Sequence, residues 1–153
     1  MGDEVRRPED LLAWQLCMEL GVFVADIVSK GPVSKDFKYC NQIRESSSAP
    51  APHIAEGFGR WGPKEFAQYL RMAISSLLET QTHLEYGLRR KYFTVKVHSD
   101  AVTLCGRALR VTRALLQSKL RQIAREEAQK RKAKETKRRP LNSDPPSGPD
   151  RKH

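Results

Sequence analysis

The sequence predicts an all-α protein: an up-and-down four-helix bundle with a kinked second helix, an extended basic fourth helix and a disordered C-terminal tail. Apolar residues recur at helical spacing in four segments, short stretches with glycine or proline separate these segments, and none shows the alternation of a strand. The 153 residues are enough for one domain with a core. We expect a flexible N-terminus, the bundle, a basic helical extension and the tail over residues 1–8, 9–120, 121–139 and 140–153.

The first helix is expected over residues 10–29. Its polar residues Gln15, Glu19, Asp26 and Lys30 follow at steps of four, seven and four, so they share one narrow stripe. Most of the remaining surface is apolar, and such a helix is buried on more than one side. Because a small monomeric bundle covers only one face of each helix, the pattern predicts a subunit interface and therefore a homo-oligomer.

The pair Gly31-Pro32 is expected to end the first helix, since glycine favours the left-handed position after a helix and proline cannot continue one. The second helix should begin near residues 34–36. We expect its inward-facing residues to be Phe37, Cys40 and Ile43.

A break or sharp kink is predicted in the second helix at Pro50 and Pro52. Each proline lacks a backbone N–H and disfavours helical dihedral angles in the residue before it. A short helical turn over residues 54–56 should follow the break, and Gly57 should close that turn.

The third helix is expected to begin at Pro63, because the first turn of a helix tolerates the missing N–H and Glu65 favours the positive end of the helix dipole. Its apolar face comprises Phe66, Leu70, Ala73, Leu77, Leu84 and Leu88. The cationic run Arg89-Arg90-Lys91 lies at its C-terminal end, where positive charge is favourable.

The fourth helix should begin near Val95 and reach about residue 136. Steps of four and three separate the apolar residues of its seam: Val97, Ala101, Leu104, Ala108, Val111 and Leu115. The apolar pattern fades after Ile123, while helix-forming residues continue. The basic segment is therefore expected to extend the last helix.

The stretch HIAEGFGRWGPKEF contains the pattern G-x-G-x-x-G at Gly57, Gly59 and Gly62, which cradles phosphate in dinucleotide-binding domains. That chemistry requires a strand before the glycines and an acidic residue at the end of a second strand. No strand is expected here, so we predict no cofactor. We interpret Gly57 as a helix cap, and Gly59 and Gly62 as residues of a tight reversal.

No catalytic or metal site is predicted either. His83 follows Glu79 by four residues, which indicates an ordinary intrahelical pair. Glu56 lies between apolar residues and a glycine, and we expect it to form a salt bridge or a backbone hydrogen bond. The cysteines have no metal-binding spacing and are expected to be buried, reduced thiols: Cys17, Cys40 and Cys105.

Two features favour the cytoplasm. The first ten residues mix acidic and basic side chains, unlike a signal peptide. The longest apolar run is interrupted by Gln15, Glu19 and Asp26, so it does not read as a membrane span. We therefore expect a cytoplasmic protein without a membrane partner.

Positive charge is concentrated in the extension. The net charge is +10, and residues 121–139 contain nine Lys or Arg and three Glu, whereas residues 1–120 contain 17 basic and 13 acidic residues. Such a segment neutralises phosphates without reading sequence. We predict nonspecific contact with RNA or DNA; the alternative is a protein–protein scaffold whose charge only maintains solubility.

A second basic feature is the pair Arg60-Trp61, a cation beside an aromatic ring that could stack on an exposed base. Basic residues outside and inside the extension form the predicted contact set. Its members are Arg60, Arg89, Arg90, Lys91, Arg121, Arg125, Lys130, Arg131 and Lys132.

Three segments resemble, in order and spacing, a family of small bacterial four-helix-bundle proteins: EDLLAWQLCMEL, QIRESSSAPAPHIAEGFGR and PKEFAQYLRMAISSLLETQTHLEYGL. That family was first noticed as products of intervening sequences within large-subunit ribosomal RNA genes. The resemblance covers about residues 9–120. Its most specific part is a structural motif comprising Ile54, Ala55, Glu56, Gly57, Gly59 and Arg60.

The resemblance implies a closed pentameric ring and no established enzymatic activity. Related accessory proteins of diversity-generating retroelements are basic rings that bind nucleic acid and a reverse transcriptase, so the resemblance implies such partners here. This chain departs from the family at His53, where Asn is usual, and at Pro52 before it. The extension after Leu120 lies outside the shared region. We expect a non-enzymatic accessory protein.

Overall fold

The computed structural model describes residues 4–139, 141 and 148, so most of the predicted C-terminal tail lies outside the described residues, as do residues 1–3 of the predicted N-terminus. No strand occurs in the described part, which confirms the all-α prediction. The elements, with η denoting a short 3-10 helix, are η1 (Pro8–Asp10), α1 (Leu12–Ile27), η2 (Pro32–Lys35), α2 (Phe37–Ser48), α3 (Pro50–Phe58), α4 (Pro63–Arg89) and α5 (Val95–Arg138).

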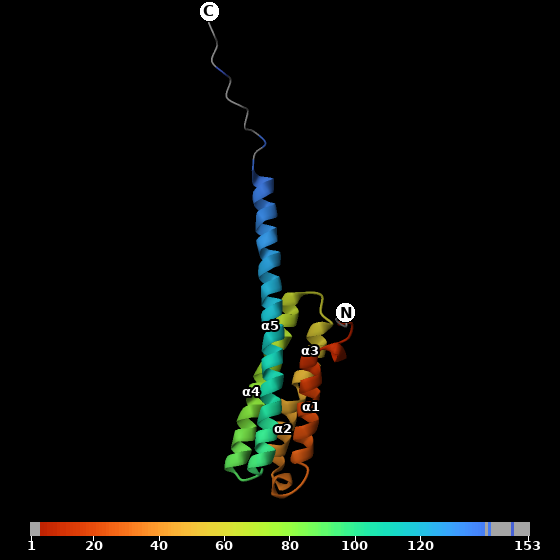
Figure 1. Ribbon diagram of the computed structural model, residues 1–153, viewed down its shortest axis with the longest axis vertical. Helices are drawn as coiled ribbons and strands as arrows, with labels where there is room; N and C mark the ends of the chain where they lie inside the picture. Colours follow the sequence, from red (N-terminus) through yellow and green to blue (C-terminus); the bar gives the residue numbers. More distant parts are fainter. Residues whose placement is uncertain (1–3, 140, 142–147, 149–153) are drawn as a thin grey trace, which may run out of the picture.

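Figure 1 shows these helices side by side along one axis. α1 and α4 run in one direction, whereas α2 followed by α3, and α5, run in the other. α2 and α3 together occupy the place of one helix, so the bundle has four arms. The α3–α4 connection lies at one end of the bundle and the α4–α5 connection lies at the other.

The core lies between these arms and is made mainly of aliphatic side chains, with a few aromatic rings and the three cysteines. Burial of each large aliphatic side chain stabilises the fold by about 1.5–3 kcal/mol. Much of the core comes from α4 and α5, through the apolar faces predicted for the third and fourth helices. α1, α2 and α3 also contribute to it. Large side chains that are fully buried include Leu20, Val24, Ile43, Ile54, Leu70, Leu77 and Leu84. None of the helices in the described part of the chain combines the length and apolarity needed to cross a membrane.

α1 has apolar residues on two sides, as its sequence suggested. One side, including Leu16 and Leu20, is buried in the core. On other parts of its surface Leu12, Met18 and Val22 are 51%, 42% and 66% exposed. A single chain therefore leaves apolar surface of α1 uncovered, and the subunit interface that would cover it stays a prediction.

The prediction that Phe37 faces inward is wrong, because its side chain is 76% exposed. The Asp36 carboxylate caps α2 by accepting a hydrogen bond from the Tyr39 backbone N–H at 3.1 Å. This cap fixes the start of α2, so Phe37 turns to solvent while Tyr39 enters the core. Cys40 and Ile43 are buried, which confirms the other two inward positions.

The second arm is divided at Ala49, between α2 and α3. Ala49 has φ −72° and ψ −34°, so its backbone stays in the helical region. Pro50 is the first residue of α3, where the missing N–H has no helical acceptor to lose. The prolines therefore begin a nine-residue helix, which is longer than the short turn expected over residues 54–56.

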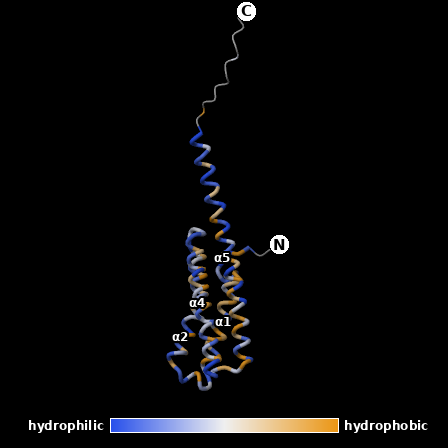
Figure 2. The backbone as a smooth tube through the Cα atoms, turned by 90° about the vertical axis from the view of Figure 1, so that its left-hand side faces the viewer, coloured by the Kyte–Doolittle hydropathy of each residue, from blue (hydrophilic) through white to orange (hydrophobic). Residues whose placement is uncertain are grey.

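α5 is the longest element, with 44 residues, or about 66 Å at 1.5 Å per residue. The ion pair between Lys64 Nζ and Glu127 Oε1, at 3.0 Å, connects it to the first turn of α4. Beyond that point α5 projects past the other helices (Figure 1). All of residues 129–139 are exposed, and Figure 2 shows that this part is mainly hydrophilic.

Candidate nucleic-acid interface

The corner between α3 and α4 is held by three polar side chains. Arg60 Nη2 donates to Glu56 Oε1 at 2.7 Å and to Tyr69 Oη at 2.9 Å. The Tyr69 hydroxyl donates to the same Glu56 oxygen at 3.0 Å. These bonds, from Arg60 and then from Tyr69, hold the pKa of Glu56 below its ordinary value. The salt bridge expected of Glu56 is therefore confirmed, and it keeps this carboxylate ionised.

Gly57 does not cap a helix, which corrects the prediction. It lies inside α3, where the residue that follows the helix is Gly59. A Cβ on Gly57 would lie 2.7 Å from Phe66 Cδ2 and 2.7 Å from Tyr69 Cβ, closer than real Cβ contacts. Gly57 is therefore required because α3 and α4 approach each other closely at this point.

Gly59 and Gly62 do not form the glycine-dependent reversal that we expected. Gly59 has φ −75° and Gly62 has φ −149°, values that any residue adopts. Between them the chain exposes Trp61, whose side chain is 103% exposed and so contacts almost nothing in the fold.

A cleft of about 230 Å³ lies beside Trp61, between this corner and α5. Phe58 and Phe66 form its aromatic floor, with their ring centroids 6.3 Å apart and edge to face. Lys119 of α5 places its ammonium 5.2 Å from the centre of the Phe66 ring. We call this the corner cleft; its lining residues are Phe58, Arg60, Trp61, Gly62, Pro63, Phe66, Lys119 and Gln122.

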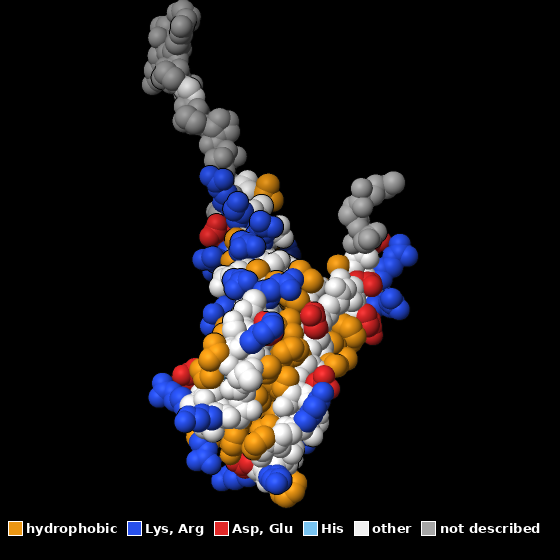
Figure 3. Space-filling model, turned by 60° about the horizontal axis from the view of Figure 1, so that its bottom comes forward, with side chains coloured by type: hydrophobic (Ala, Val, Ile, Leu, Met, Phe, Trp, Pro, Cys, Tyr) orange, Lys and Arg blue, Asp and Glu red, His pale blue; other side chains and the backbone are white. Residues whose placement is uncertain are grey.

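α5 leads from the corner cleft directly into the projecting segment, residues 129–139. This segment contains seven Lys or Arg and one Glu, a net charge of +6 on about 16 Å of helix. Of the predicted contacts, Arg121 and Arg125 lie on α5 beside the corner, and Lys130, Arg131 and Lys132 lie in the projecting segment, all of them exposed. Figure 3 shows Lys and Arg side chains gathered where α5 leaves the bundle.

Arg89, Arg90 and Lys91 lie at the opposite end of the bundle, in the α4–α5 turn. About 45 Å of α5 separates Val95, at this turn, from Arg125. Arg89 Nε pairs with Glu85 Oε1 at 3.1 Å, and the Arg90 guanidinium lies 5.6 Å from the centre of the Tyr92 ring. The structure thus does not bring these three residues together with the rest of the predicted contact set.

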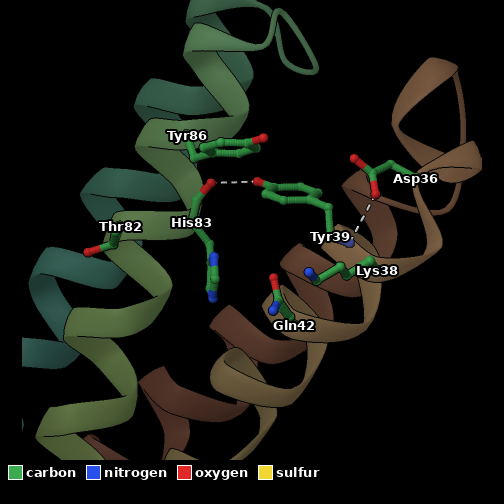
Figure 4. Close-up of a pocket in the computed structure, with 7 residues that line it drawn as sticks. All are labelled: Asp36, Lys38, Tyr39, Gln42, Thr82, His83 and Tyr86. Atoms are coloured by element: carbon green, nitrogen blue, oxygen red, sulfur yellow. Dashed lines mark hydrogen bonds between the residues drawn. The ribbon is translucent and has the colours of Figure 1, made fainter.

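A polar groove of about 340 Å³ lies near this turn, between α2 and α4 (Figure 4). Tyr39 Oη donates to the carbonyl oxygen of His83 at 2.5 Å, and its ring is stacked on Tyr86 with the centroids 5.7 Å apart. Burial raises the pKa of Tyr39. His83 also makes the predicted pair with Glu79, at 3.4 Å. Tyr39, His83 and Tyr86 are thus engaged in packing between α2 and α4.

The three cysteines are buried and free, as predicted. Burial raises the pKa of the Cys17 thiol to about 11 and that of Cys105 to about 12, and it also raises the pKa of Cys40. Such thiols are poor nucleophiles at neutral pH because the thiolate is the reactive form. Among the described residues no three His, Cys, Asp or Glu side chains cluster as metal ligands would.

Sequence reasoning missed two members of the site. Tyr69 lies on α4, nine residues after Arg60, and its helical position beside the apolar face gave no sign of its bond to Arg60. Lys119 precedes the basic segment by two residues, but its contact with Phe66 joins positions 53 residues apart. A signal for Lys119 was available, since it shares a helix face with Gln122 and continues the basic run.

The fold and this site define a helical-bundle protein with a basic helical projection and an aromatic cleft at its base. The chain belongs to the 23S rRNA-intervening sequence protein family, whose sequence model matches residues 9–114. The predicted resemblance is thus confirmed. The match ends before the corner-cleft residues of α5 and before the projecting segment.

A solved structure supports the fold. It is a protein of unknown function from the S23 ribosomal protein family of Bacteroides thetaiotaomicron, with a TM-score of 0.63 and 18% sequence identity. The alignment covers 69% of this chain and 98% of that one. No curated protein gives a significant match to the sequence.

Proposed function

We propose that this chain is a non-enzymatic, homo-oligomeric accessory protein that contacts RNA or DNA nonspecifically through α5. One observation carries the proposal: every residue of the projecting segment is exposed, and the segment has a net charge of +6. None of the ion pairs in the described part of the chain involves this segment. Its cations are therefore available to a polyanion.

Phosphate neutralisation is the chemistry that such a helix supplies. Lys and Arg bind phosphate oxygens and release the counterions condensed on the nucleic acid, which favours binding at low salt. Phosphate contacts position a protein without reporting base identity. The projecting segment consists mainly of Lys, Arg, Ala and Glu or Gln, so the proposal is one of nonspecific binding.

Self-association would multiply this effect. Leu12, Met18 and Val22 give α1 an apolar surface that a second copy could cover. In a closed cyclic ring all copies are related by rotation, and if the bundles lie along the ring axis their α5 helices project from the same end. The family resemblance favours five copies. Several projecting segments on one end would bind a single strand with a high effective concentration.

The alternative is a protein–protein scaffold in which the charge serves solubility. A partner protein such as a reverse transcriptase fits this alternative and equally fits the accessory role. The two differ in whether the purified protein binds nucleic acid by itself.

The test is a fluorescence anisotropy titration of a labelled 30-nucleotide strand with the full chain between 50 and 200 mM salt. If about six phosphates are neutralised per chain, the logarithm of the association constant falls with the logarithm of salt concentration with a slope of roughly −4 to −5. Native mass measurement in the same buffer gives the oligomer. Absence of binding at 50 mM salt contradicts the proposal and leaves the scaffold.

A further inference from the structure

The corner cleft is the feature that the nonspecific proposal leaves unexplained. Trp61 is a large aromatic side chain that is fully exposed, so in this chain it contributes nothing to the core. It stands at the mouth of a cleft whose floor is aromatic and whose α5 wall bears Lys119 and Gln122. Phosphate neutralisation needs none of these rings.

We infer that the corner cleft binds an unpaired base of single-stranded nucleic acid, with Trp61 as the stacking surface and the projecting segment holding the adjoining phosphates. This inference rests on the proposed function. Bases stack on aromatic side chains whatever their identity, so a stacking site remains nonspecific in sequence. In a duplex both faces of each internal base are covered by its neighbours, so only an unpaired base can enter.

The size and chemistry of the cleft fit a single base. Pockets for drug-sized ligands measure about 300–1,000 Å³, so a cleft of about 230 Å³ takes a smaller group. Phe58 is half-buried and offers apolar contact, whereas Phe66 is 7% exposed and packs against it. Gln122 donates one amide hydrogen bond to Glu126 at 3.3 Å, and its amide group also has a second N–H and a carbonyl oxygen for a base edge.

Charge favours a nucleic acid over another aromatic ligand. The Lys119 ammonium lies over the Phe66 ring at the wall of the cleft, where it can meet a phosphate adjoining the bound base. Arg60 also lines the cleft but is bonded to Glu56 and Tyr69, so its charge is largely matched. Beyond Glu127 the same helix becomes strongly basic, and this gives the strand a path away from the cleft.

The test compares full-length wild type with Trp61→Ala on four probes at 50 mM salt. These are a 20-nucleotide DNA strand, the RNA strand of the same sequence, a 20-base-pair duplex, and a 20-nucleotide strand of abasic sites. Loss of one stacked base lowers affinity about 5- to 150-fold. We expect Trp61→Ala to lose that much on the DNA and RNA strands and to be unchanged on the duplex and the abasic strand.

A matched control is Phe37→Ala, which removes an aromatic ring that is also exposed, at 76%, from the other end of the bundle. It should bind all four probes as wild type does. A second readout uses a Trp14→Phe background, in which Trp61 is the remaining tryptophan. Its fluorescence should be quenched by the unpaired strands and not by the abasic strand.

The outcomes separate the two proposals. If wild type binds every probe but Trp61→Ala binds the single strands equally well, or the fluorescence of Trp61 does not respond, the stacking site is wrong and the proposed function stands. If wild type binds no probe, both are wrong. A difference of more than tenfold between the DNA and RNA strands would identify which sugar the site prefers.

Discussion

Particular aromatic and basic residues at the two ends of the bundle differ in the contacts that they make within the chain. At the α4–α5 turn, aromatic rings pack on one another: the ring centroid of Tyr39 lies 5.2 Å from that of Tyr92 and 5.7 Å from that of Tyr86. At the α3–α4 corner, by contrast, Trp61 is fully exposed. The aromatic residues of the turn thus stabilise the fold, whereas Trp61 is available to a ligand.

The basic residues differ in the same way. At the turn, Arg90 lies over the ring of Tyr92, and the Tyr92 hydroxyl donates to Asp36 at 2.6 Å. At the other end the cations of the projecting segment lie on a helix that no other element of the described chain covers. Arg89 and Arg90 at the turn thus have partners within the chain, whereas none of the ion pairs in the described part of the chain involves the projecting segment.

The largest effect should come from ending the chain after Ala128, which removes the projecting segment and keeps the Lys64–Glu127 ion pair. Because about six phosphate contacts are lost, affinity for a 30-nucleotide strand at 50 mM salt should fall about 100-fold or more. Anisotropy titration measures this, and thermal unfolding serves as the control. Those of the removed residues that the structure describes are exposed, so the unfolding temperature should not change. Affinity within threefold of wild type would show that the two ends do not differ as described.

A smaller effect, on stability, is expected from Gly57→Ala. The new methyl group would lie 2.7 Å from atoms of Phe66 and Tyr69, and the resulting overpacking should cost about 1–3 kcal/mol of unfolding free energy. The matched control is Gly59→Ala, where the nearest atom would be 3.5 Å away and the change should stay within about 0.5 kcal/mol. Urea unfolding of both variants measures the difference. Equal unfolding free energies for the two variants would mean that the α3–α4 corner does not require the close packing at Gly57.

The smallest expected effect is on the stability of the protein at acidic pH, and it arises from Asp36 near the α4–α5 turn. Hydrogen bonds, first from Tyr92 and then from the Tyr39 N–H, hold the pKa of Asp36 below its ordinary value of 3.8. A carboxyl whose pKa is lowered on folding stabilises the protein above its unfolded pKa, and this contribution is lost as the pH falls through the folded pKa. In Tyr92→Phe the unfolding free energy should therefore decrease less than in wild type as the pH falls below about 4.

Chemical unfolding between pH 2 and 6 measures this profile for Tyr92→Phe and wild type. Nucleic-acid binding at neutral pH is the control, and it should be unchanged because the turn is remote from the projecting segment. If the pH dependence of unfolding is the same as in wild type, the Tyr92 hydrogen bond does not lower the pKa of Asp36. Weaker nucleic-acid binding by Tyr92→Phe would contradict the separation of the two ends.

Local signals in the sequence predicted most of the fold. Pro63 begins α4 as expected, since the rule for proline in the first turn involves only neighbouring residues. Val95 begins α5 as expected, after Thr94, whose hydroxyl accepts a hydrogen bond from the Val97 N–H, and the Glu56–Arg60 bridge joins residues four positions apart. Phe37 was misplaced because the cap at Asp36 shifts which side of α2 faces the core.

The parts that could not be predicted depend on contacts between distant positions. The role of Gly57 requires knowing that α4 returns along α3 and brings Phe66 within contact distance. To predict the corner cleft one must know that Lys119 contacts Phe66. To predict the packing at the turn one must know that Tyr92 contacts Asp36, 56 residues earlier. Helical periodicity reports which face is apolar but not which residue of another helix that face meets.

The most direct test of the difference between the two ends compares two variants that each lose three positive charges. One replaces Arg131, Lys132 and Lys134 with Gln in the projecting segment, and the other replaces Arg89, Arg90 and Lys91 with Gln at the turn. The salt dependence of binding to a 30-nucleotide strand is measured for both. The slope should become shallower by about 2–3 for the first variant and stay within about 0.5 of wild type for the second. Equal changes in slope for the two variants, or a larger change for the turn, would contradict the account.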